Sequence, residues 1–345
     1  MSITISDVAN EAGVSKSTVS KVLNNWSTIS PETAARVHTA IEKLHYVPNS
    51  RAVSFARQVT QNIVYLTDLG KNSAYLYPHM FDMMCGVHHE LTSRNYTLTL
   101  VDISEESYPG ERAMNEISRR SADGMIIHGS AINEELAHHL IAEKVPHIII
   151  GHPNFENRLC WIDTDHALAG EYAADHMIAC GYSDVLFVAG RKGDVISNQR
   201  LKGFVKGMLN HGVHIPNRRI LYTANTRESA YEETLSVWTS SPYPQAIVCE
   251  NNTLALGVMK ALRELSVSIP DDVGVLTFDI YPYSEIVDPA LTAIDINVYD
   301  MGIQAGEMMI RKLENPDLLI QSYTTLPVLI QRASTKQAAV PSCLF

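Results

Sequence analysis

The sequence predicts a small all-α head followed by a large α/β body of doubly wound parallel sheet. Three observations carry this prediction. The first fifty residues contain three short segments with helical apolar spacing, each preceded by a residue that can cap a helix. From Gln61 onward, short runs rich in Ile, Val and Leu alternate with helical segments. These runs are continuously apolar, as in strands buried on both faces, and such alternation is typical of parallel sheets.

Length and composition limit the classes of protein to which the chain can belong. The chain has 345 residues, of which 46% are hydrophobic, so two or three globular domains are expected. No apolar run approaches the length of a membrane span, and the N-terminus lacks the pattern of a signal peptide. The five cysteines are scattered without a CxxC spacing, which favours free thiols. We therefore expect a cytoplasmic protein.

Charge is distributed unevenly along the chain. The formal net charge is −11, yet residues 1–60 carry a net charge of +2 and the remaining residues −13. A mildly basic head on an acidic body suggests that only the head meets a polyanion.

The head contains a candidate helix-turn-helix. Ser6 is expected to cap a first helix, which Gly13 ends, because glycine readily adopts the left-handed conformation. Ser15 is expected to cap a second helix, and Ser30 followed by Pro31 to begin a third. Two short helices joined by a tight turn form the helix-turn-helix unit.

The second helix presents side chains that can donate to base edges and phosphates, namely Lys16, Ser17, Ser20 and Lys21. The spacing alone leaves another interpretation open, a three-helix packing module with a solvated polar face.

Two stretches, TISDVANEAGVSKSTVSKVLNN and ISPETAARVHTAIEKLHYVPN, closely resemble the DNA-binding head of the LacI/GalR family of bacterial transcription regulators. The resemblance implies a recognition helix at 16–24. The DNA-binding residues that it implies are Ser6, Lys16, Ser17, Thr18, Ser20, Lys21, Asn24, Asn49, Arg51, Ala52, Phe55 and Arg57.

A hinge follows the head. The segment NSRAVSFARQVTQ is too short to hold a helix alone in water, and in the family it folds only when two subunits sit on DNA. Phe55 stands where the family usually has a Leu that enters the minor groove, and Val53 where Arg is frequent. An apolar wedge is the favoured role of Phe55, although packing of a linker residue on the body is an alternative. Arg51 and Arg57 are expected beside phosphates.

The body has regularly spaced elements. Strands are expected at 63–69, 97–103, 124–130, 147–152, 185–190, 219–223, 246–250 and 274–279, with helices at 78–94, 133–144, 167–180, 199–211 and 253–265. Ligands in doubly wound folds bind at the carboxyl ends of the strands. The polar residues expected there are Asp68, Ser130, Asp165, Arg200, Asn251 and Asp279.

The body also resembles the LacI/GalR family, through DTDHALAGEYAADHMIACGY, NQRLKGF, CENNTLALGVMKAL and DDVGVLTFD. The resemblance covers residues 3–335 and implies two similar subdomains, like those of periplasmic sugar-binding proteins. The expected division is a head at 1–48, a hinge at 49–60, one subdomain at 61–163 and 292–323, a second at 164–291 and 324–335, and a tail at 336–345.

The family pattern implies an effector site in the cleft between the subdomains, formed by Asp68, Tyr77, His79, Ser130, Asp165, Arg200, Asn225, Asn251 and Asp279. A guanidinium suits bidentate contacts, so Arg200 with Asp279 is expected to grip vicinal hydroxyls. The alternative for each residue is a helix cap or an interface pair. Asn225 stands where an aromatic often covers a sugar, so stacking would have to come from Tyr75, Tyr77 or Trp161. A sugar or sugar derivative is therefore expected rather than a purine.

The sequence thus predicts a ligand-gated repressor, a homodimer on a pseudo-palindromic operator, and not an enzyme. No cofactor is expected. No metal site is expected either, because adjacent histidines such as His138 and His139 point apart on a helix and so cannot share a metal ion. Two alternatives stay open: gating by a phosphocarrier protein, and a solute-binding receptor without a role on DNA. The tail at 332–345 lacks the heptads that pair dimers in some relatives, which predicts a dimer rather than a tetramer.

Overall fold

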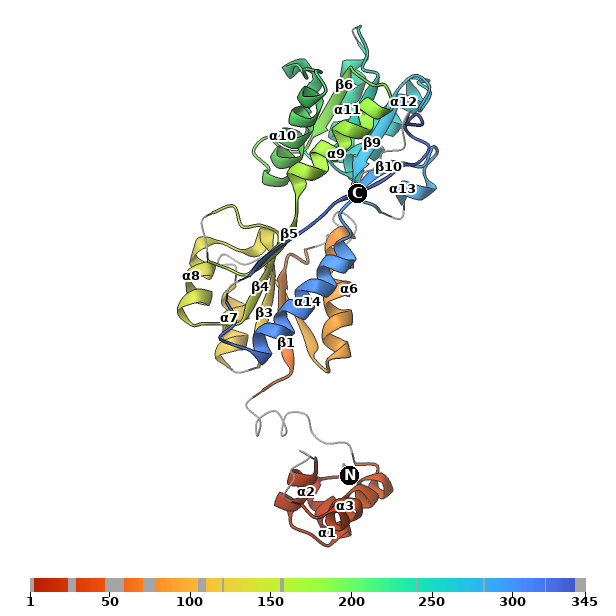
Figure 1. Ribbon diagram of the computed structural model, residues 1–345. Coiled ribbons are helices and arrows are strands. Elements are labelled where there is room, and N and C mark those ends of the chain that lie inside the picture. The colour runs from red at the N-terminus through yellow and green to blue at the C-terminus, as the bar shows by residue number, and fades with distance from the viewer. Residues whose placement is uncertain are drawn as a thin grey trace. The chain divides into compact units, whose positions relative to one another are not determined.

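The computed structural model describes residues 3–23, 29–46, 59–70, 78–104, 110–119, 121–155, 158–239, 241–281, 283–319 and 321–338. The chain forms two units, a head up to residue 61 and a body from residue 62 onward (Figure 1). Among the described residues, no helix is both long and apolar enough to cross a membrane.

The described part of the head contains three helices, α1 (Ile5–Ala12), α2 (Lys16–Leu23) and α3 (Pro31–Leu44). The prediction that Ser6 caps the first helix is wrong, because the helix begins at Ile5, two residues earlier than a Ser6 cap implies, and its N-cap is Thr4. The backbone N–H and hydroxyl of Thr4 both donate to the carboxylate of Asp7, at 2.8 and 2.7 Å. This reciprocal contact holds the first turn in place of a Ser6 cap.

The other expected helix ends in the head are confirmed. Gly13 has a φ of 63° and ends α1 in the left-handed conformation. The hydroxyl of Ser15 accepts from the backbone N–H of Thr18 at 3.1 Å, and Ser30 caps α3 with Pro31 in its first turn. The three helices share one apolar core, formed by Val8, Ala9, Ala12, Val19, Val22, Val37 and Ala40.

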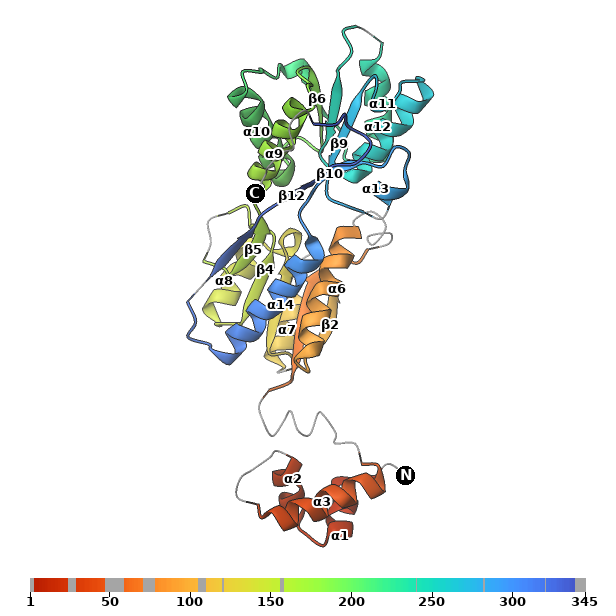
Figure 2. The ribbon, with the colours of Figure 1, turned by 45° about the vertical axis from the view of Figure 1, so that its right-hand side comes forward.

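The body contains two sheets, each of six strands within the described residues (Figures 1 and 2). The first has the order β11-β5-β4-β3-β1-β2 and is parallel throughout. Its strands are β1 (Asn62–Thr67), β2 (Thr97–Asp102), β3 (Gly124–His128), β4 (His147–Ile150), β5 (Trp161–Thr164) and β11 (Ser322–Thr325). Helices α6 (Pro78–Ser93) and α14 (Val298–Glu314) cover one face, and α7 (Glu111–Ser118) and α8 (Glu134–Ala142) the other.

The second sheet has the order β12-β10-β9-β8-β6-β7, and only its β10–β12 pair is antiparallel. Its strands are β6 (Val185–Ala189), β7 (Ile220–Tyr222), β8 (Ala246–Cys249), β9 (Gly274–Phe278), β10 (Thr292–Asp295) and β12 (Val328–Ile330). Helices α9 (His166–Ala179) and α10 (Val195–Asn210) cover one face, and α11 (Arg227–Val237) and α12 (Asn252–Glu264) the other. The short helices are α13 (Tyr283–Ile286), η1 (Gly129–Ala131) and η2 (Asn217–Arg219).

The expected crossing of the chain at residue 291 is wrong. Residues 292–295 form β10, which pairs with β9 and β12 in the second sheet, and the next helix, α14, packs on the first sheet. The crossing therefore lies at 296–297. The expected list of strands omitted β5, β10, β11 and β12, whose short sequences WIDT, TAID, SYTT and VLI give little apolar signal.

Candidate functional site

The exposed face of α2 is polar and basic. Lys16, Ser17 and Lys21 are exposed, whereas Val19 and Val22 are buried in the core of the head. The same helix therefore divides its residues between a face that holds it to α1 and α3 and a face turned to solvent. A helix with this division, placed second in a helix-turn-helix, can enter a major groove.

Other predicted DNA-binding residues differ in their surroundings. Thr18 is half-buried, and its hydroxyl lies 2.9 Å from that of Ser15, so it takes part in the start of α2. Ser6 and Ser20 are also half-buried. The remaining predicted residues lie outside the described part of the chain, namely Asn24, Asn49, Arg51, Ala52, Phe55 and Arg57.

In the body, Arg200 lies within α10, which agrees with the helix expected at 199–211. The expectation that Arg200 lies at the carboxyl end of a strand is wrong. The helix begins at Val195, because Asp194 caps it by accepting from the backbone N–H of Ser197 at 2.8 Å. α10 packs very closely on α9: a Cβ placed on Gly170 would lie 2.1 Å from the carbonyl oxygen of Arg200. This contact sets the position of Arg200 over the carboxyl end of the second sheet.

Arg200 is 2% exposed and contacts three segments of the chain. Its Nη2 donates to Oδ1 of Asp279 at 2.9 Å and its Nη1 to Oδ2 at 3.3 Å. Nη1 also donates to the carbonyl oxygen of Glu250 at 2.8 Å and lies 3.5 Å from its Oε1. Nε donates to Nδ1 of His166 at 3.4 Å, and the guanidinium lies over the ring of Phe278. The expected pairing of Arg200 with Asp279 is present.

The charges of this group affect one another. Burial lowers the pKa of Arg200, but the carboxylates of Asp279 and Glu250 outweigh it, so the pKa is raised overall. Glu250 is 6% exposed, and burial raises its pKa to about 7, with Arg200 opposing and Asp279 and Asp194 adding to the rise. The charged guanidinium of Arg200 thus makes two contacts with the Asp279 carboxylate and one longer contact with the Glu250 carboxylate.

Two amides extend the group. Asn251 caps α12 by accepting from the backbone N–H of Leu254 at 3.0 Å. Its Nδ2 donates to Oδ1 of Asn225 at 2.7 Å and to Oε2 of Glu250 at 2.6 Å. Asn251 is therefore a helix cap, the alternative weighed for it, and its amide also belongs to the polar group.

A second acidic position lies at the end of β5. Asp163 is 8% exposed and accepts from the backbone N–H groups of His152 and Thr164, both at 2.8 Å. Its Oδ1 lies 3.3 Å from Nε2 of the buried His166. Burial raises the pKa of Asp163, but His166 and the two backbone N–H groups outweigh it and the pKa is lowered. His166 thus connects Asp163 to Arg200.

The contact of His79 with Tyr281, like that of Asp163 with His166, joins the parts of the body that contain the two sheets. Nδ1 of His79, in α6, lies 2.6 Å from the hydroxyl of Tyr281, two residues after Asp279, and the two rings are nearly parallel. Burial lowers the pKa of His79, and it lowers that of His128, at the end of β3, to about 4. Both imidazoles are therefore neutral near pH 7. Charge interactions link His79 to Asp279 and Arg200, and His128 to His79 and Asp163.

The structure brings four of the predicted effector residues into one hydrogen-bonded group, linked through Glu250: Arg200, Asp279, Asn251 and Asn225. The side chain of Asp165 caps α9 by accepting from Leu168, and Ser130 bonds to His128. Asp68 accepts from the backbone of Gly70. Tyr75 and Tyr77 lie outside the described residues. Trp161 begins β5 and packs edge-on against His152, so it lies at the wrong end of that strand to stack on a ligand there.

Sequence reasoning missed Glu250, Asp163, His166 and Tyr281. For Glu250 a signal was present, because a carboxylate directly follows the buried strand AIVC and precedes a capping Asn. A charged side chain at the end of a strand that is buried on both faces is itself expected to be largely buried. Asn252, the next residue, is fully buried, and its Nδ2 donates to the carbonyl oxygens of Phe278 and Asp279.

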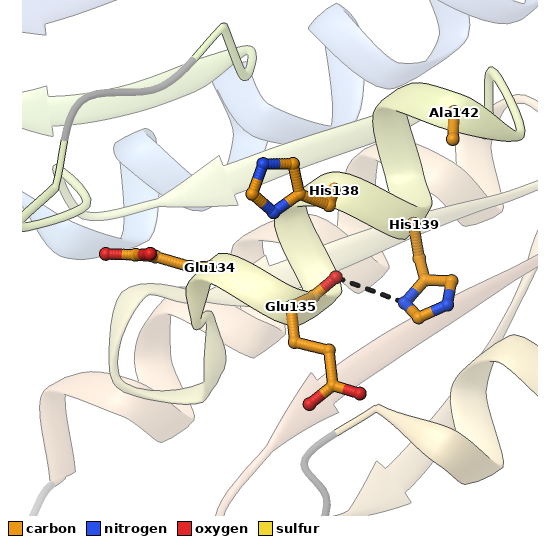
Figure 3. Close-up of a pocket in the computed structure, with 5 residues that line it drawn as sticks. All are labelled: Glu134, Glu135, His138, His139 and Ala142. Atoms are coloured by element: carbon orange, nitrogen blue, oxygen red, sulfur yellow. Dashed lines mark hydrogen bonds between the residues drawn. The ribbon is translucent and has the colours of Figure 1, made fainter.

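A separate surface depression lies along α8 and is lined by Glu134, Glu135, His138, His139 and Ala142 (Figure 3). All five belong to one helix, and the four polar residues are exposed. In Figure 3 the two histidines point apart, as expected from their adjacent positions, and Nδ1 of His139 lies 3.1 Å from the carbonyl oxygen of Glu135. A single exposed helix face offers nothing to enclose a ligand, so the polar group around Arg200 is the better candidate.

Comparisons with known proteins agree on both parts of the chain. Residues 4–49 match the family described as bacterial regulatory proteins, lacI family, and residues 174–335 match a periplasmic binding protein-like domain. The chain is 27% identical to the HTH-type transcriptional repressor PurR of Haemophilus influenzae (strain PittEE), over 96% of this chain and 98% of the relative. It is also 27% identical to catabolite control protein A of Priestia megaterium, over 97% and 100%.

Among solved structures, the lac repressor dimer bound to operator and the anti-inducer ONPF has a TM-score of 0.82. The match covers 98% of this chain and 100% of that chain, at 21% identity, and so shows a shared fold.

Proposed function

The chain belongs to the lacI family of bacterial regulatory proteins, and from this we propose that it is a dimeric, effector-gated repressor. It is a DNA-binding transcriptional regulator. The finer features, namely the dimer, the effector, the residues that bind it and the location in the cytoplasm, are our proposal. The protein acts through binding and not through catalysis.

The observation that carries this function is the exposed face of α2. Lys16, Ser17 and Lys21 stand on a helix that is held from behind by Val19 and Val22. Two such helices in a dimer would read two half-sites of a pseudo-palindromic operator. The lac repressor structure with the same fold is a dimer on operator DNA, which supports the proposal.

The effector site that we propose is the group around Arg200. Hydroxyls of a sugar or sugar derivative would contact Asp279, Asn225 and Asn251, while Arg200 holds these residues in place. The contact of His79 with Tyr281 lies beside this group and spans the two sheet-containing parts of the body. A ligand that changes the relative position of these two parts would alter this contact and so change the affinity of the head for DNA. Coupling between two sites requires contacts that differ between two states of the protein.

The test is selection of DNA by the full-length chain from a random duplex library. A twofold-symmetric operator is expected. Lys16→Ala should weaken binding to it, whereas Lys43→Ala should not, because Lys43 lies on α3 and pairs with Glu11. Enriched sequences without twofold symmetry, or equal effects of the two variants, would contradict the assignment. Adding sugars, and then a phosphocarrier protein, to the operator complex separates the proposed gating from gating by a protein partner.

A further inference from the structure

The polar group around Arg200 holds more negative than positive charge. Asp279 and Glu250 both contact the Arg200 guanidinium, and Asp163 is connected to it through His166. Asp194 and Asp295 act on Glu250 and Asp279 from farther away. On the positive side, Arg191 is exposed and its Nε donates to the carbonyl oxygen of Ala224. The histidines 79 and 128 are neutral near pH 7.

Of the two carboxylates that contact Arg200, that of Glu250 makes the weaker contact. The two short guanidinium contacts of Arg200 go to Asp279 and to the backbone of Glu250, and the Glu250 carboxylate lies 3.5 Å from Nη1. Its other contact is the amide of Asn251 at 2.6 Å. A buried carboxylate without a close cation is unfavourable unless it takes up a proton or a positive charge arrives.

Gly190 lies beside the Glu250 carboxylate. A Cβ on Gly190 would lie at ordinary contact distance from Oε2 of Glu250, 3.4 Å, and from Oδ1 of Asn225, 3.5 Å, so a longer side chain there would reach both oxygens. Both oxygens accept from Nδ2 of Asn251, and each can accept a second hydrogen bond, so together they suit a ligand nitrogen that donates several.

We propose that the effector carries a protonated amine together with hydroxyls, and that Glu250 receives the amine. This inference rests on the proposed function, since it names the chemistry of the ligand for the same site. Glu250 and Asn225 bind the ammonium, and Asp279 and Asn251 bind the hydroxyls. Phosphorylated compounds are excluded, because a phosphate would face the carboxylates while the guanidinium is already paired. Glu250 is thus the residue that determines specificity.

The experiment uses matched probes on the full-length protein. D-glucose and D-galactose are each compared with their 2-amino and 6-amino derivatives and their 6-phosphates, by calorimetry at pH 7. In at least one series an aminated sugar is expected to bind ten times or more tightly than the parent sugar, and the phosphate not at all. Glu250→Gln should remove this preference, because it keeps the shape and loses the charge. Glu143→Gln, at an exposed position, should leave it unchanged.

A second measurement needs no variant and so does not depend on its folding. If an ammonium binds Glu250, the partly protonated carboxyl loses its proton, so the heat of binding at pH 7 should depend on the ionisation enthalpy of the buffer in the sense of proton release. The neutral sugar should show no such release.

The outcomes separate the inference from the function on which it rests. Equal or tighter binding of the parent sugar or the phosphate overturns the inference and leaves a sugar-gated repressor in place. Retention of the amine preference in Glu250→Gln also overturns it. If no probe binds while operator binding persists, the amine inference and the sugar effector both fail. If the chain also fails to select an operator, the proposed function fails.

Discussion

A single side chain, Arg200, connects three segments of the body that are distant in the sequence. It contacts His166 on α9, Glu250 at the end of β8 and Asp279 at the end of β9. Removing one member of a buried ion pair commonly costs about 3–5 kcal/mol, because the partner is left charged and unpaired. Loss of effector response in Arg200→Ala would therefore not separate binding from stability, and a substitution of Glu250 is more informative.

We predict that Glu250→Gln flattens the pH dependence of stability. Burial raises the pKa of Glu250 from 4.5 to about 7, so the folded protein binds its proton more tightly than the unfolded chain. The contribution of this group is therefore present below pH 4.5 and lost as the pH rises to about 7, by roughly 2–4 kcal/mol. Relative to the variant, the wild type should lose stability between pH 5 and 8. Urea unfolding of both proteins, with Glu143→Gln as control, measures this; parallel curves would count against a buried Glu250 carboxyl.

In the head, we predict that Lys16 and Ser17 set operator choice and that Arg57 does not. Lys16 and Ser17 are exposed at the start of α2, and losing a base contact should cost about 1–3 kcal/mol at one base position. Arg57 lies outside the described residues and is expected beside a phosphate. Its loss should weaken all sequences alike and lower the salt slope by about one. Binding of Ser17→Ala and Arg57→Ala to an operator library measures both; an unchanged sequence profile for Ser17→Ala would refute the prediction.

At the scale of elements, glycines set how closely the helix pairs pack. A Cβ on Gly170 in α9 would lie 2.1 Å from a backbone oxygen of α10, and one on Gly203 in α10 would lie 1.9 Å from a backbone oxygen of α9. α6 and α14 use the same arrangement, since a Cβ on Gly86 would lie 2.0 Å from the carbonyl oxygen of Tyr299. The helices that carry Arg200 and His79 are therefore placed by backbone-to-backbone contact.

We predict that Gly170→Ala destabilises the body by about 1–3 kcal/mol or more and weakens effector binding. The added methyl meets the backbone of Arg200, which has no flexible end to move aside, so the two helices must separate. Urea unfolding and calorimetry test the two effects. Lys202→Ala, at an exposed position of α10, is the matched control and should stay within about 0.5 kcal/mol of the wild type. A wild-type stability for Gly170→Ala would show that the helices can separate without cost.

On the scale of the whole molecule, the proposed function requires that the two units act together. Among the described residues, the head has its own core of seven buried residues, and the body has its own cores on both faces of each sheet. The segment that joins them, 47–58, lies outside the described residues. Separate cores are consistent with a head whose arrangement on DNA is set by the body through a linker.

We predict that the protein is a dimer in solution and not a tetramer. The sequence of residues 332–345 shows no heptad pattern and contains Pro341, and a heptad pattern is what a helix that pairs two dimers requires. Light scattering at micromolar concentration should give twice the mass of the 38.3 kDa chain. A stable species of four chains would disprove this.

The sequence by itself determined the architecture and part of the site. Capping residues and apolar periodicity located the head helices, and continuous apolar runs located eight of the strands, because both signals are local. Polarity at strand ends indicated Asp279 and Asn251 for the same reason. Only the tertiary structure showed that β10 belongs to the second sheet and that the chain crosses to the first sheet after it. The four residues of β10 carry no local signal for pairing with β9. The tertiary structure alone joined His79 to Tyr281 and left Glu250 beside a guanidinium that Asp279 already holds. Such contacts depend on distances between segments far apart in the chain, and no local pattern contains those distances.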